Sequence, residues 1–286
     1  MKTVFLMTIA LVAFWSPHAH AQSLKPSWSP DGKTLVFYKR EQPHMLIKTL
    51  DLQTGNISGL TDNHVWLHSP KFSRDGSRIF VTGEVDGTAG LFTVDAKTGE
   101  VTRLANIASR VMHPEESPTG GLLVFDKQME DGNFDAHLLN LATGEIEALI
   151  GTAESEFHPS WSPDGRYIVL DTRRNNLREI IRIDVTNKST ETLRSAAVET
   201  INHPIYGPGQ SLFFASGEGI TRFDLYTRKE TILFYADEGW SAFAPSLSPD
   251  GKKIAFSHVT KDYSRGQIMV MDIDGSGAHI LHDDAN

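Results

Sequence analysis

The sequence predicts an all-β protein, a six-bladed β-propeller with four antiparallel strands in each blade. A motif that begins with proline and continues to Ser-Pro-Asp-Gly or a variant of it recurs along the chain, and a fixed period of this kind is typical of repeat architectures. Between copies, short apolar runs alternate with turn residues and show no helical periodicity. Four short strands in 41 to 45 residues are typical of a propeller blade. The leading prolines of the six repeats are Pro26, Pro70, Pro114, Pro159, Pro204 and Pro245.

Each repeat supplies four strands in the same order. The first strand ends in a turn such as Ser29 to Gly32, where proline presets one backbone angle and glycine tolerates a positive one. An apolar run, such as Leu35 to Phe37, forms the second strand, and a third run ends at an acidic or amide residue such as Asp51. A short fourth strand, as at Val101 to Leu104, closes the repeat. The repeats leave no linker, so we expect residues 22–286 to form one domain.

Composition excludes several classes of protein. The 286 residues include no cysteine and 22% charged residues, which excludes a disulfide-stapled or a disordered chain. The net charge of −9 argues against nucleic acid as a partner. Beyond the first residues, no run reaches the roughly 18 apolar residues that a membrane span needs, so no span is expected after cleavage of the N-terminal segment.

The first 21 residues have the pattern of a secretory signal peptide. Lys2 supplies a positive start, Thr3 to Trp15 is apolar, and Ala19 to Ala21 is a cleavage site with small residues. We therefore expect cleavage after Ala21 and a periplasmic mature protein.

The repeat also carries a family resemblance. Pro26 to Gly32 and Pro159 to Gly165 both read Pro-Ser-Trp-Ser-Pro-Asp-Gly, which resembles the WD40-like PD40 repeat of TolB-type periplasmic propellers. The resemblance runs from Pro26 to about Leu281 and implies a six-bladed propeller. TolB itself has an additional α/β domain before its propeller, whereas here the first repeat begins four residues after the expected cleavage site. The resemblance therefore implies the propeller of this family without its N-terminal domain.

Common catalytic motifs are missing from the sequence. It contains no G-x-S-x-G elbow of the hydrolases that accompany related propellers, no H-E-x-x-H and no Walker A loop. No catalytic residue is assigned on this basis, and a non-catalytic role is favoured.

Three histidines recur in phase with the repeat. His113, His158 and His203 each stand directly before a leading proline, 45 residues apart. The first strands of the blades line the central channel of a propeller, so these imidazoles are candidate ligands for one divalent metal. His68, two residues before Pro70, is a further candidate. The alternative is structural: a residue before proline is expected to have extended backbone, and each histidine would then cap its strand.

The loops that enter the first strands are the candidate ligand-binding surface at the channel mouth. They carry aromatic, basic and acidic side chains, which are residue types that dominate binding sites at concave surfaces. The alternative for the two tryptophans is packing between blades. The candidates are Trp66, Arg110, Glu154, Glu156, Glu199 and Trp240.

Two functions follow from these candidates. The first is a monomeric, non-catalytic periplasmic propeller that binds a protein or an envelope component at the channel mouth. The second is a metal-dependent, lyase-like enzyme acting on carbohydrate, with the histidines holding the metal and a general base close by. Arg110 is the one strong base that the sequence places at the channel mouth.

Overall fold

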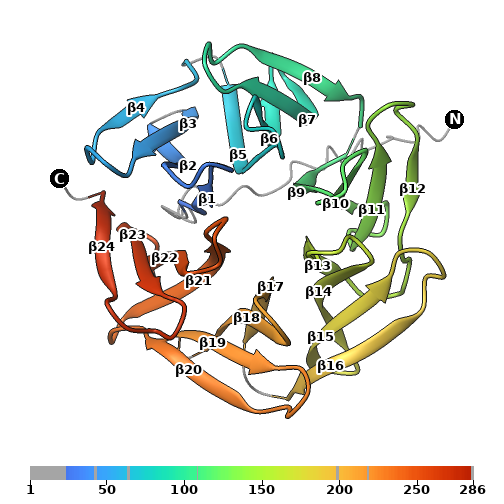
Figure 1. The fold of residues 1–286 in the computed structure, drawn as a ribbon. Coiled ribbons are helices and arrows are strands. Elements are labelled where there is room, and N and C mark those ends of the chain that lie inside the picture. The colour runs from blue at the N-terminus through green and yellow to red at the C-terminus, as the bar shows by residue number, and fades with distance from the viewer. Residues whose placement is uncertain are drawn as a thin grey trace, which may run out of the picture.

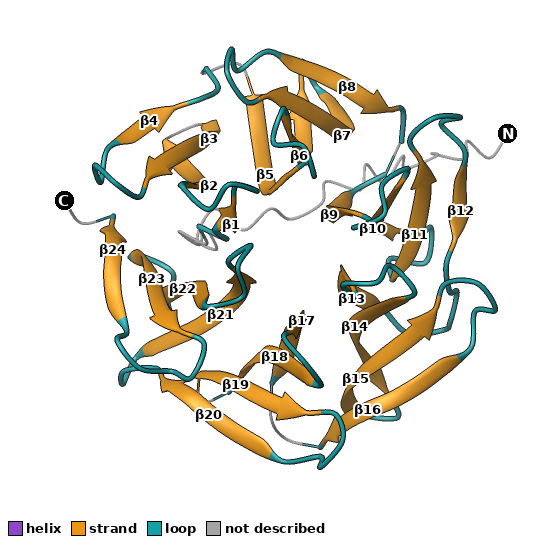
Figure 2. Ribbon diagram, in the orientation of Figure 1, coloured by secondary structure: helices purple, strands orange, loops and turns teal. Residues whose placement is uncertain are grey.

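The computed structural model describes residues 24–41, 44–62, 65–107, 109–197, 200–217 and 219–284. The expected signal peptide, residues 1–21, lies outside these ranges. The described residues contain strands, turns and loops only, arranged in a ring around a central axis (Figures 1 and 2). In this part of the chain, no helix has the length and apolar character that crossing a membrane requires.

The strands follow the repeat closely, because each apolar run of the sequence becomes one strand. In chain order they are β1 (Ser27–Trp28), β2 (Thr34–Glu41), β3 (His44–Asp51), β4 (Ile57–Gly59), β5 (Val65–Phe72), β6 (Arg78–Val85), β7 (Thr88–Asp95), β8 (Val101–Ala105), β9 (Val111–Glu116), β10 (Leu122–Gln128), β11 (Phe134–Asn140), β12 (Ile146–Ala148), β13 (Glu156–Trp161), β14 (Tyr167–Arg174), β15 (Leu177–Asp184), β16 (Thr190–Ala196), β17 (Ile201–Gly207), β18 (Ser211–Ser216), β19 (Gly219–Asp224), β20 (Glu230–Tyr235), β21 (Trp240–Leu247), β22 (Lys253–Thr260), β23 (Gly266–Asp272) and β24 (His279–Asp283).

The propeller fold expected from the sequence is confirmed. Strands β9–β12, β13–β16, β17–β20 and β21–β24 form four separate four-stranded antiparallel sheets. Strands β1–β8 form one eight-stranded sheet, in which a single parallel pair, Met45 on β3 with Trp66 on β5, joins the two halves. At this junction the structure differs from the expectation of separate, wholly antiparallel blades. The strands nearest the axis are β1, β5, β9, β13, β17 and β21 (Figure 1).

The Ser-Pro-Asp-Gly turns are held by their own side chains. In the turn after β13, the Ser162 hydroxyl donates to the Asp164 carboxylate at 2.6 Å and accepts the Tyr167 N–H at 2.8 Å. Gly165 has φ of +71°, in the left-handed region that favours glycine. The same serine–aspartate hydrogen bond occurs in three other repeats, which explains why the motif repeats with the fold.

In five of the six repeats, a β-bulge in the innermost strand positions the residue before the leading proline. The register shifts between Val124 and Asp126 opposite β9, and also on β13, β17, β21 and β5 at this level. The pre-proline residue is left-handed, with φ of +39° to +53°, instead of extended as expected. A bulge bends its strand and changes the direction of a side chain. This explains why the bulged residues have a left-handed and not an extended backbone. The six residues in this conformation are Lys25, Ser69, His113, His158, His203 and Ala244.

The hydrophobic core lies between neighbouring sheets. Trp161, which is 5% exposed, packs with Val124 and Leu138 of the preceding sheet and with Ile168 of its own sheet. Its indole N–H donates to the carbonyl of Glu115 on β9 at 3.0 Å. The ordered core thereby fixes the innermost strands relative to one another, and with them the side chains that face the axis.

Candidate metal centre in the central channel

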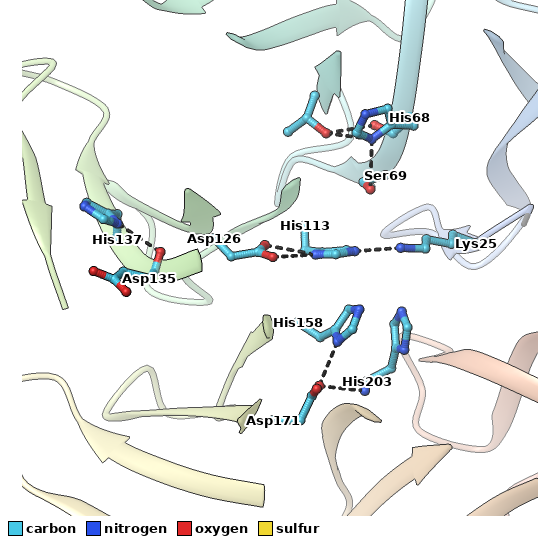
Figure 3. A network of polar contacts seen from close by, with 11 residues as sticks. Lys25, His68, Ser69, His113, Asp126, Asp135, His137, His158, Asp171 and His203 are labelled. Carbon is cyan, nitrogen blue, oxygen red and sulfur yellow. Dashed lines mark hydrogen bonds and ion pairs between the residues drawn. The ribbon is translucent and has the colours of Figure 1, made fainter. Parts of the chain in front are cut away.

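The structure brings His113, His158 and His203 together near the axis. They lie on β9, β13 and β17, and one ring nitrogen from each falls within 4.8 Å of the other two. The ring centroids of His158 and His203 are 3.5 Å apart, and that of His113 is 4.3 Å from His158 and 5.8 Å from His203. Figure 3 shows the three rings turned toward a common space. The shared bulge explains the convergence, because it gives all three residues the same backbone conformation.

Each imidazole is oriented through its Nδ1 atom. Nδ1 of His113 is 2.9 Å from the carboxylate of Asp126 on β10, and Nδ1 of His158 is 2.7 Å from Asp171 on β14. Nδ1 of His203 is 2.9 Å from the side-chain oxygen of Asn202. An N–H at Nδ1 donating to these oxygens leaves the lone pair on Nε2. Carboxylate partners of this kind orient the histidine ligands of metal sites.

The two carboxylates have further contacts that fix their positions. The Asp171 oxygen that contacts His158 also accepts the backbone N–H of His203 at 3.1 Å, so it holds two of the three histidines. Asp126 is fully buried. Burial raises the pKa of Asp126 to about 8, and the nearby Lys25 charge opposes this rise.

Lys25 reaches the histidines from the first repeat. Its Nζ atom lies 2.6 Å from Nε2 of His113 (Figure 3). Burial lowers the pKa of Lys25 to about 8, while the negative charge of Asp126 acts in the opposite direction.

Burial also keeps two of the histidines neutral near pH 7. It holds the pKa of His113 well below its ordinary value, and the Lys25 charge adds to this effect. Burial also lowers the pKa of His203 well below its ordinary value, and the electrostatic interaction with His158 adds to this effect. Nε2 of His203 is buried and has no hydrogen-bond partner among the described residues. A neutral imidazole with a free lone pair is the form that binds a metal.

The histidines open into a cavity on the axis. Its volume of about 60 Å³ exceeds the roughly 10–15 Å³ that one water needs. All six left-handed residues that precede the leading prolines line it, together with five of those prolines. Lys71 and Glu115, which form an ion pair at 3.0 Å, lie on its wall. The cavity therefore combines an apolar ring with a few polar groups, as ligand sites do.

His68 does not join this group. Its neighbour Ser69 occupies the bulged position, and Nδ1 of His68 is 2.9 Å from the Thr82 hydroxyl. Burial lowers the pKa of His68 to about 3. A one-residue offset in a strand turns a side chain to another direction, which accounts for its separate position.

The candidate residues at the channel mouth have varied environments, and none of those that the structure describes lines the cavity. Trp66 and Glu154 are half-buried, and Arg110 is exposed. Trp240 on β21 stacks on His258 of the neighbouring strand β22, with ring centroids 4.5 Å apart, so this contact lies within one sheet and not between blades. Glu199 lies outside the described residues.

Glu156 differs from the expectation of an exposed binding residue. Its side chain is fully buried, accepts a hydrogen bond from the Thr152 hydroxyl at 2.5 Å and lies 3.8 Å from Arg174. Burial raises its pKa to about 7, and the neighbouring Asp135 adds to the rise. The loop before β13 folds over this carboxyl group, so Glu156 does not face solvent.

Sequence reasoning missed the residues that hold the histidines. Asp126 and Asp171 each follow their histidine by 13 residues, and this shared offset was the available signal. Lys25 stands in the same repeat position as the histidines, and this shared position before a leading proline predicts a place at the axis for it as well.

Fold and site together define a β-propeller protein with a cluster of histidines in its central channel. The family model of the TolB beta propeller domain, PD40, matches residues 16–210, which is more than half of the chain. The chain therefore belongs to the TolB-type β-propeller family, as its repeat predicted.

Two curated relatives match part of the chain. An uncharacterized protein of Agrobacterium fabrum, Atu1656, is 28% identical over 120 residues, covering 42% of this chain and 38% of the relative. An uncharacterized peptidase of Bacillus subtilis, YuxL, is 27% identical over 151 residues, covering 40% of this chain and 23% of the relative. The chain thus matches less than half of the length of either relative.

Solved structures share the fold at low sequence identity. A candidate TolB from Agrobacterium tumefaciens has a TM-score of 0.71 and 19% identity, covering 82% of this chain and 87% of that one. TolB from Acinetobacter baumannii has a TM-score of 0.57 and 19% identity, covering 89% and 53%. An oligogalacturonate lyase in complex with manganese has a TM-score of 0.58 and 17% identity, covering 88% and 89%. At these identities the likeness shows the fold alone.

Proposed function

We propose that this protein is a periplasmic propeller of the TolB type that binds a protein or envelope component through one divalent transition metal in its central channel. The observation that carries the proposal is the convergence of three imidazoles whose Nδ1 atoms all have oxygen partners. Three histidines leave at least one coordination position open for a ligand. A metal bound there would supply a Lewis-acidic position; His113, His158 and His203 would hold it, and Asp126 and Asp171 orient the rings of His113 and His158.

We also propose that residues 22–286 form one six-bladed domain after removal of a signal peptide. Counting the eight-stranded sheet as two blades gives six, because one residue pair joins its halves. The family match supports the periplasmic location, since TolB-type propellers are periplasmic.

Metal analysis of the purified protein tests the proposed function. We expect inductively coupled plasma mass spectrometry to find about one zinc, manganese or similar ion per chain after dialysis against the metal. The triple variant H113A/H158A/H203A should lose this ion while keeping a native circular dichroism spectrum, because the three rings are outside the blade cores. H68A is the matched control and should retain the ion. A wild-type protein without metal, or a triple variant that keeps it, contradicts the proposal.

A metal-dependent lyase is the second candidate function, and Lys25 is the observation that favours it. A lyase needs a general base near the metal, and an amine with a pKa of about 8 beside the histidines meets this requirement better than the exposed Arg110. The test is to incubate the metal-loaded protein with oligogalacturonate and follow the ultraviolet absorbance of an unsaturated product. Activity that disappears in K25A supports this candidate, and no product at high protein concentration excludes this substrate.

A further inference from the structure

The position of Lys25 bears on how the histidine site is loaded. Lys25 belongs to the first repeat and has the same left-handed conformation, directly before Pro26, that His113 has before Pro114. A left-handed backbone conformation before a leading proline therefore places a lysine at the axis, as it places the three imidazoles. Its amino group meets one of them at 2.6 Å.

The contact between Lys25 and His113 involves the one nitrogen lone pair through which His113 could bind a metal. A neutral imidazole has one N–H and one nitrogen lone pair. With Nδ1–H donating to Asp126, the lone pair is on Nε2, which is the atom that Lys25 contacts. An ammonium group donates hydrogen bonds and has no lone pair of its own. Lys25 and a metal ion therefore cannot both interact with Nε2 of His113 at the same time.

The charges around the axis strengthen this exclusion. Lys25 and a divalent cation carry charges of the same sign, and they would meet in a buried space where such repulsion is large. The positive charge of Arg110 repels Lys25, as a divalent cation would, and Asp171 and the ionised form of Asp126 attract it. A negative charge on either group therefore favours one cation beside the histidines, and Lys25 and a metal compete for that position.

We propose that Lys25 competes with the divalent metal for Nε2 of His113 and thereby limits loading of the three-histidine site. The inference rests on the proposed function, because it concerns the same metal. It predicts that the lysine withdraws into the channel when the metal binds, so metal affinity includes the cost of breaking the Lys25–His113 contact.

The test compares zinc affinity in wild type, K25M and K71M by competition with a chromophoric chelator. K25M keeps the length and apolar stem of the side chain but removes its charge. Hydrogen bonds to charged groups are strong enough that K25M should bind zinc about tenfold more tightly or better. K71M is the matched control, because Lys71 lines the same cavity but pairs with Glu115; its affinity should stay within about twofold of wild type.

The outcomes separate this inference from the proposed function. Tighter binding by K25M alone supports the competition. Equal or weaker binding by K25M, with zinc still bound by wild type, overturns the competition and leaves the metal site standing; weaker binding would identify Lys25 as a ligand. Zinc bound by none of the three proteins overturns both. Thermal melts of all three proteins confirm that the comparison is made on folded chains.

Discussion

Single residues before the leading prolines decide what faces the channel. The 45-residue spacing predicted that His113, His158 and His203 would face one axial space, and the structure brings them there. Their Nδ1 partners were not predictable in the same way. Asp126 and Asp171 lie on the second strands, and which side chain opposes a histidine there depends on where the bulge shifts the register. A pattern of period two cannot locate such a shift.

Glu156 provides a pH-dependent prediction at the residue scale. Its pKa rises from 4.5 to about 7 in the folded protein. Between these values the folded state retains a proton that the unfolded state has released, so wild-type stability falls as pH rises and levels off above about pH 7. Glutamine does not titrate. We therefore expect the free energy of unfolding of E156Q, relative to wild type, to increase by about 2–3 kcal/mol from pH 5 to pH 8.

Urea denaturation at several pH values measures this difference. E154Q is the control, because Glu154 is two residues away and only half-buried. A pH-independent difference between E156Q and wild type would show that Glu156 is ionised in the folded protein throughout this range.

At the scale of single elements, the first strand of each repeat links its own sheet to the preceding one. Trp161 on β13 does this through its packing and through its hydrogen bond to Glu115 on β9. Trp161 belongs to the repeated Pro-Ser-Trp-Ser-Pro-Asp-Gly motif, so its core position agrees with its place in the repeat. Trp66 has no such place in the repeat, and it lies half-buried at the junction of β3 and β5.

Truncation of the two tryptophans should therefore have unequal effects. W161A should lower the free energy of unfolding by about 3–5 kcal/mol, as large aromatic truncations in cores do. W66A should cost clearly less, because its side chain is only partly removed from water. Chemical denaturation of both variants measures the two losses. Equal losses would mean that Trp66 also fills a core position.

At the scale of the whole molecule, the described strands close the ring by packing. The first and last sheets are each built from consecutive strands, and β1 pairs only with β2. Between them, Leu24 and Phe37 pack with Ala255 and Ile268, and the Trp28 indole donates to the Ser246 carbonyl at 3.0 Å. This arrangement agrees with the repeat, because the first repeat begins on an innermost strand. The parallel pair between β3 and β5 was unpredictable, because it depends on how two neighbouring blades approach.

This seam should respond locally to mutation. W28A removes the indole that joins β1 to β21, so we expect faster amide hydrogen exchange in β1, β2 and β21. Amide hydrogen exchange in β9 and β13, which are joined by the equivalent contact of Trp161, should stay unchanged. Hydrogen-exchange mass spectrometry resolves the two seams. An increase spread evenly over all sheets would show instead that the ring opens as one cooperative unit.

The left-handed residue before each leading proline also allows the side chains of the channel to be changed one repeat at a time. All six left-handed residues before the leading prolines line the cavity, and each belongs to a different repeat, so the chemistry of the axis is set by one side chain from each repeat. Lysine, serine, three histidines and alanine are the present choices. None of these side chains is needed to fill the cores between sheets, so one blade at a time could be given a new axial group while the scaffold stays the same. In a propeller of this kind, each repeat contributes one axial side chain that can differ without a change of fold. A relative with the same fold therefore need not have the same chemical groups at its axis.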